Sequence, residues 1–197
     1  LVDENFWKSQ VMWQGYTRYS LYESIREYAA IQLKKSATEE TQSAFNVQQR
    51  HTAYYRQFGT QEHLNSFSMK GGVRRRQKLV LELENLQGAM RFALAQGKSN
   101  DAALFALGAM QIYSEQGPFT LAIELAEIIL KLSDLSTQLK IRMLVQQARA
   151  HRWAAHSEDA KVKLEMALEF AIQIDEQKSE GIVLTQLGEV NTHLGLI

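Results

Sequence analysis

A pattern that recurs after 38 residues in the second half of the chain constrains the fold more than any other feature. The stretches EQGPFTLAIELAEIIL (115–130) and AHSEDAKVKLEMALEF (155–170) each read as a turn followed by an alanine-led helix. Such repeats are typical of stacked helical hairpins, because one hairpin alone cannot bury its apolar face. When Ala122 is aligned with Ala160, the coinciding pairs are Ala126 with Leu164, Ile129 with Ala167 and Leu130 with Leu168.

A further helix precedes each turn, so the pattern predicts antiparallel helical hairpins. These helices are ALFALGAMQIYSEQG (103–117) and IRMLVQQARAHRWAAH (141–156), and GIVLTQLGEVNTHLG (181–195) begins a third copy that residue 197 truncates. Pro118 is the one proline in 197 residues. Because proline breaks helices, its scarcity permits a mainly α chain.

The repeat resembles the tetratricopeptide repeat (TPR). That resemblance implies a right-handed solenoid of helical hairpins with a concave binding groove. The offset of 38 residues is longer than the usual period of about 34, and the family's proline near the repeat end is missing from both complete copies. The matching residues are Tyr113, Gly117 and Ala122 in copy one, Ala160, Ala167 and Leu168 in copy two, and Leu187, Gly188 and Gly195 in copy three.

The first half of the chain has a different pattern. Residues 1–22 are rich in aromatic side chains around Gln14-Gly15-Tyr16, which predicts a β-hairpin that turns at Gly15. Ser20 and Glu23 have the spacing of a capping box and predict that a helix begins there. Apolar residues at helical spacing predict one helix over 79–97, whereas SFSMKGGVRRRQK (66–78) is expected to be a mobile loop.

Three phrases in this half resemble the region after the NB-ARC-type nucleotide-binding module of bacterial STAND signal-transduction ATPases, many of which regulate transcription. In that family a winged-helix domain, a helical stretch and repeats follow the module. The resemblance implies that residues 1–22 are a winged-helix remnant, 23–100 a helical linker region and 101–197 the TPR-like repeats. The phrases are Arg18-Tyr19 through Ile25-Arg26-Glu27-Tyr28-Ala29, Arg50-His51 with Ala53-Tyr54-Tyr55, and Glu84-Asn85-Leu86 with Ala89, Phe92, Ala93 and Leu94.

Three arginines form the sharpest candidate binding site. Arg142, Arg149 and Arg152 are spaced so that one helix face carries all of them, with Gln146 and Trp153 beside them. Guanidinium groups at this position in a TPR groove are expected to bind a carboxylate or phosphate of a protein or small-molecule effector. The alternative is a surface on which they pair with carboxylates such as Glu124 or Glu158.

Arg74, Arg75 and Arg76 are a second candidate, for contact with phosphate or nucleic acid. The alternative is a solvated surface, because no aromatic residues alternate with these arginines to stack on bases. No metal site is predicted, because the spacing of His151 and His156 points them apart on a continuous helix. No catalytic residue is predicted either, since the serines lack a nucleophile motif.

The composition of the chain limits its location and the kinds of partner that it binds. The chain has no cysteine and no net charge, and no apolar run long enough to span a bilayer. We therefore expect a cytoplasmic location, no membrane partner, and DNA contact only through a parent protein. Because the sequence begins with Leu1 and has no G-x-x-x-x-G-K-[ST] motif, we expect a piece of a longer chain whose ATP site lies in another domain.

The favoured interpretation is a non-catalytic sensor or interaction segment of such an ATPase. Its expected partners are the effector in the groove, the parent's other domains and a second copy of itself. The alternative is a free-standing TPR adaptor that binds a partner peptide. An α-helical hydrolase is the third interpretation, and turnover assays distinguish it from the other two.

Overall fold

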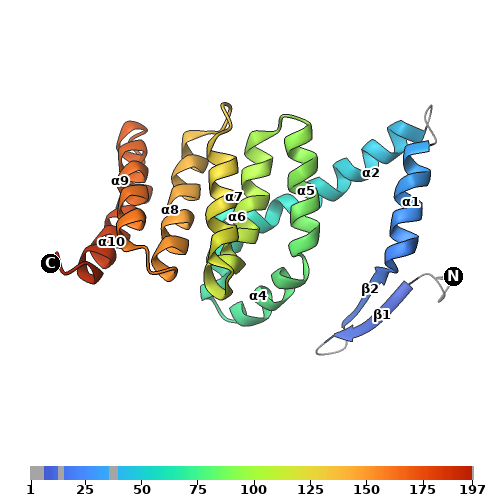
Figure 1. Cartoon of the computed structure of the whole chain (residues 1–197), viewed down its shortest axis with the longest axis horizontal. Coiled ribbons are helices and arrows are strands. Elements are labelled where there is room, and N and C mark those ends of the chain that lie inside the picture. Colours follow the sequence, from blue (N-terminus) through green and yellow to red (C-terminus); the bar gives the residue numbers. More distant parts are fainter. Residues whose placement is uncertain (1–6, 13–15, 36–39, 197) are drawn as a thin grey trace. The chain divides into compact units, whose positions relative to one another are not determined.

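The computed structural model describes residues 7–12, 16–35 and 40–196, and the side chains of residues 21–29, 31–32 and 45–196 (Figure 1). The chain divides into two compact units, residues 1–49 and 50–197. In the first unit, strands β1 (Trp7–Met12) and β2 (Tyr16–Leu21) pair antiparallel, and α1 (Glu23–Lys35) follows them. Gly15, where the turn is predicted, lies outside the described residues. The winged-helix origin of this segment stays a prediction.

The second unit is built of helices that pack as sequential antiparallel pairs, so the predicted mainly α class is confirmed (Figure 1). It begins within α2 (Glu40–Tyr55). No helix among the described residues is long and apolar enough to cross a membrane. The other elements are η2 (Arg56–Gly59), α3 (Gln61–Asn65), η3 (Ser66–Ser68), α4 (Gly72–Leu81), α5 (Leu83–Ala95), α6 (Ser99–Gln116), α7 (Phe119–Leu130), α8 (Thr137–Trp153), α9 (Ser157–Gln173) and α10 (Gln177–His193).

The positions that align in the sequence repeat are the positions that the hairpins bury. Ala122 of α7 and Ala160 of α9 are both 0% exposed. The aligned residues that follow them in each helix are buried or partly buried as well. Alanine has little bulk, so α7 and α9 can pack closely against their neighbours at these points. Two apolar clusters result. One extends from α3 to α8, and the other joins α8, α9 and α10.

The segment predicted to be a mobile loop, residues 66–78, is instead helical, as η3 followed by α4. The prediction takes the basic residues as solvated charges, whereas two of them bond to backbone carbonyls. Arg75 Nε donates a hydrogen bond to the Ser66 carbonyl at 3.1 Å, and an Arg76 guanidinium nitrogen donates to the Phe67 carbonyl at 3.2 Å. Gly71 turns the chain with a left-handed φ of 82°. The helix predicted over 79–97 is also interrupted, since α4 ends at Leu81 and α5 begins at Leu83.

Gly59 brings the segment before the hairpins into close contact with α6. A Cβ atom at this position would lie 1.7 Å from the carbonyl oxygen of Leu104, so glycine alone permits the approach. The Gly59 carbonyl accepts a hydrogen bond from Arg142 Nη2 of α8 at 2.7 Å. Thr60 then begins α3, where its side-chain oxygen accepts from the backbone N–H of His63. The segment η2–α3–η3 is thereby held against α6 and α8.

We predict that Gly59→Ala destabilises the chain by about 2 kcal/mol or more, since the new methyl group must displace backbone atoms of α6. The free energy of unfolding in urea measures this loss. Gly181→Ala in α10 is the matched control, because a Cβ there meets no atom within 4 Å and alanine favours a helix. Equal stabilities of the two variants would contradict the close contact.

Candidate binding groove

A groove runs between α3 and the first helices of the hairpins. Two hollows of about 420 and 390 Å³ share Gln61, Leu64 and Asn65 of α3 with Gln146 and Arg149 of α8. We call these two adjoining hollows together the Arg149 groove. Residues of α10, among them Lys178 and Ile182, line the first hollow, and Arg76, Arg152 and Trp153 line the second.

The structure places all three predicted arginines along this groove but uses two of them within the chain. Arg142 donates to the Gly59 carbonyl, and Arg152 forms an ion pair with Glu189 of α10. The carboxylates weighed from the sequence as partners, Glu124 and Glu158, are therefore not the ones that Arg152 contacts. Arg149 has no hydrogen bond or ion pair among the described residues. The predicted clamp of three guanidinium groups thus reduces to Arg149, with its neighbours held in place around it.

The electrostatic setting of Arg149 is that of a partly buried cation. Burial is the main cause that lowers the pKa of Arg149 from its ordinary value, and nearby Arg152 lowers it further. Glu115 and Glu189 act in the opposite sense. Burial also lowers the pKa of Arg142. Both guanidinium groups stay protonated at neutral pH, because arginine does not lose its proton in proteins. Arg149 has therefore lost part of its hydration without gaining a direct partner.

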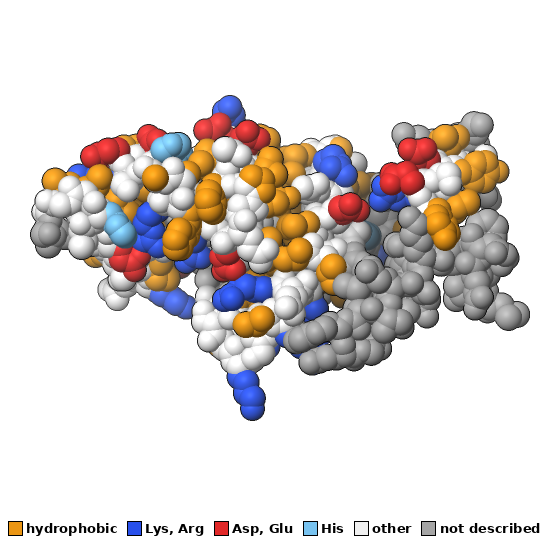
Figure 2. All heavy atoms as spheres, turned by 60° about the horizontal axis from the view of Figure 1, so that its bottom comes forward, with side chains coloured by type: hydrophobic (Ala, Val, Ile, Leu, Met, Phe, Trp, Pro, Cys, Tyr) orange, Lys and Arg blue, Asp and Glu red, His pale blue; other side chains and the backbone are white. Residues whose placement is uncertain are grey.

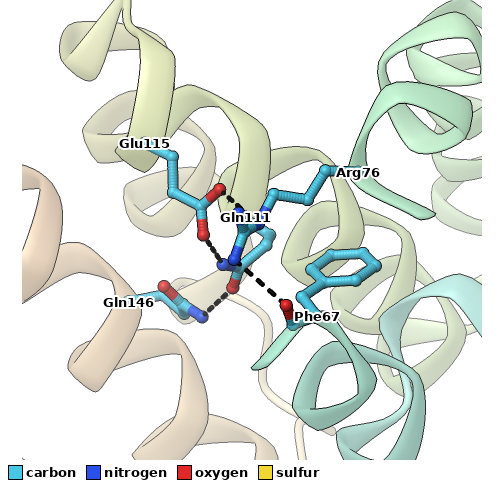
Figure 3. Close-up of polar contacts among 5 residues, drawn as sticks. All are labelled: Phe67, Arg76, Gln111, Glu115 and Gln146. Carbon is cyan, nitrogen blue, oxygen red and sulfur yellow. Dashed lines mark hydrogen bonds and ion pairs between the residues drawn. The ribbon is translucent and has the colours of Figure 1, made fainter. Parts of the chain in front are cut away.

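A polar network forms the wall of the second hollow and joins three helices (Figure 3). Arg76 of α4 pairs with Glu115 of α6 at 3.0 Å, and Glu115 accepts a hydrogen bond from Gln111 one turn earlier. Gln111 in turn accepts from the side-chain amide of Gln146 in α8 at 3.0 Å. The oxygen of the same Gln146 side chain is buried and has no hydrogen-bond donor among the described residues.

The second predicted site, Arg74 to Arg76, does not present three guanidinium groups together to solvent. Arg75 and Arg76 are partly buried and bonded to carbonyls of η3, whereas Arg74 is exposed. On the face seen in Figure 2, lysine and arginine side chains lie among apolar and acidic ones. Contact of these arginines with phosphate or nucleic acid stays a prediction.

Sequence reasoning missed two features near the groove. The first is α3, which forms one wall of the groove. The one feature of the sequence that indicates this helix is Thr60, its N-cap residue. The second is the approach of His151 and His156, whose ring centroids lie 6.1 Å apart. The spacing argument assumed one continuous helix, but α8 ends at Trp153 and Ala155 has a left-handed φ of 64°. Trp153, predicted to pack beside the arginines, is 59% exposed at the groove.

No family model matches the chain, and neither does any curated protein or solved structure. Evidence for function therefore comes from the geometry of the groove and from the sequence itself.

We predict that Arg76 and Glu115 stabilise the chain cooperatively, since both side chains are partly buried at the joint between α4 and α6. Arg76→Met and Glu115→Gln, measured singly and together by urea unfolding, should give a coupling free energy of about 1 kcal/mol. Purely additive effects would show that the pair contributes nothing to the wall.

We also predict that acid destabilises the chain through His63 and His151. Burial, and then Arg75, lowers the pKa of His63 below 6.5, and burial lowers the pKa of His151 despite Asp159. The unfolded chain therefore binds more protons as the pH falls below 6.5, so folding stability falls as well. Urea unfolding between pH 7 and pH 5 should show this loss. His63→Leu should reduce the slope, and His193→Gln, at an exposed position, should not change it.

Proposed function

We propose that the chain is a non-catalytic binding module that holds an anionic segment of a partner, such as an acidic or phosphorylated peptide, in the Arg149 groove. The observation that carries this proposal is Arg149 itself. It is a partly buried cation on the groove with no hydrogen bond or ion pair among the described residues. A cation that has lost hydration gains most from a carboxylate or phosphate that enters beside it.

The neighbouring groups favour a peptide over a bare anion. Leu64 and Ile182 add apolar surface along the first hollow. Lys178 adds a positive charge to those of Arg142 and Arg149 in this lining, which also contains Glu176. A short acidic peptide combines a negative charge with an apolar side chain, and the groove offers a surface for each.

The architecture supports the same proposal. We infer that α6–α7, α8–α9 and α10 are TPR-like units of a right-handed solenoid, supported by the 38-residue offset and by the matching burial of its aligned positions. In such repeats the first helix of each unit lines the concave side. The residues of α6, α8 and α10 that surround the groove belong to first helices.

The resemblance of the first half to STAND ATPases supports a wider proposal, that the module is the sensor of a transcription regulator. In that case the peptide or effector acts by binding one state of the parent more tightly than another. The reading frame around this chain tests the wider proposal. A phosphate-binding loop upstream supports it, and a reading frame without one leaves a free-standing adaptor.

We predict that Arg149→Ala weakens the binding of acidic peptides by about tenfold or more, since a hydrogen bond to a charged group contributes roughly 1.5–3 kcal/mol. Fluorescence polarisation with a panel of phosphoserine, paired-aspartate and uncharged peptides measures the effect. Arg91→Ala, at an exposed position of α5, is the matched control. Equal affinity of Arg149→Ala and the unaltered chain, or no preference for the acidic peptides, would refute the proposal.

A further inference from the structure

Three metal-ligating side chains that do not line the Arg149 groove meet where α8 turns into α9. His151 comes from the last turn of α8, His156 from the connection and Asp159 from the first turn of α9. One ligand atom from each lies within 4.8 Å of the other two. The backbone builds this arrangement, because the His156 N–H donates to the His151 carbonyl at 2.8 Å and Ala155 reverses the chain.

His151 brings an unpartnered ring nitrogen to this cluster. Its side chain is buried, and Nδ1 has no hydrogen-bond partner among the described residues. Asp159 Oδ2 lies 3.8 Å from that nitrogen, too far for a hydrogen bond. Two ligand atoms of a tetrahedral zinc ion lie about 3.4 Å apart, given bonds of roughly 2.0–2.1 Å. The gap between Nδ1 and the carboxylate therefore suits an intervening ion better than a shared proton.

The protonation states are those that metal binding needs. Burial lowers the pKa of His151, so its imidazole is neutral at pH 7 and its lone pair is available. Lys163 and Glu127 also act on this imidazole with opposite signs, so neither decides the local charge. His156 and Asp159 are exposed, and their side chains are free to rotate toward a common ion.

We propose that His151, His156 and Asp159 bind one Zn²⁺ ion, with water in the fourth position. Two imidazole nitrogens and one carboxylate oxygen form a ligand set that zinc accepts in tetrahedral geometry. The ion joins the end of α8 to the start of α9. Because the unfolded chain does not hold the three groups together, the ion stabilises this hairpin.

Titration of Zn²⁺ into the metal-free, tag-free 197-residue chain by isothermal calorimetry tests the site. We expect one ion per chain, and both His156→Ala and Asp159→Asn should weaken binding by about tenfold or more through loss of a ligand. These variants are chosen because both positions are exposed, whereas a cavity at His151 risks unfolding the chain. His193→Ala is the control for adventitious histidine binding and should bind as the unaltered chain does.

A second measurement separates a built site from a weak surface contact. Saturating Zn²⁺ should raise the midpoint of thermal unfolding of the unaltered chain and of His193→Ala, but not that of His156→Ala or Asp159→Asn. No binding by the unaltered chain overturns the proposal. So does full affinity in either ligand variant, or a loss of binding in His193→Ala.

Discussion

The contact of Gly59 with the backbone of α6 is the constraint on which the rest of the second unit depends. It places η2–α3–η3 against the hairpin helices, where Arg142 of α8 then donates to the Gly59 carbonyl. Without a Cβ at position 59 the two backbones meet directly, and α3 becomes one wall of the Arg149 groove. The stacked hairpins thus acquire a side wall from a segment outside the repeat.

The wall formed by α3 changes which arginines of α8 have partners within the chain. Arg142 is used to hold the segment, and Arg152 is used to hold α10 through Glu189. The cation between them, Arg149, is partly buried and has no such partner among the described residues. Arg76, Glu115, Gln111 and Gln146 link α4, α6 and α8 around it, so the groove is bordered by side chains whose positions are set by one another (Figure 3). This mutual support favours the proposed binding of a ligand of opposite charge.

The sequence predicted the elements that depend on local periodicity. Ala122 and Ala160 are equally buried because helical spacing carries the same face into the core in both hairpins. Prediction from the sequence failed where backbone groups distant along the chain decide the structure. The sequence predicts a loop around Arg75 and Arg76. Their guanidinium groups instead donate to carbonyls nine residues away, and spacing along the chain does not reveal such acceptors.

For the candidate sites, the sequence predicted which residues lie together but not which of them have partners within the chain. The sequence placed Arg142, Arg149 and Arg152 together, and they do lie along one groove. It could not tell which of them is free, because Gly59 and Glu189 are 83 and 37 residues away from the arginines they contact. The approach of His156 to His151 depends on a left-handed residue, Ala155, which is not a glycine and has no clear sequence signal.

The most direct test of the Arg149 groove observes the arginine side chains themselves. The Nε–Hε signals of a ¹⁵N-labelled chain, followed by NMR during titration with a phosphoserine peptide, report which guanidinium groups meet the anion. The account predicts a saturable shift of the Arg149 signal, with the Arg142 signal unchanged because Gly59 already holds that group. No shift at Arg149, or equal small shifts of all arginine signals, would contradict it.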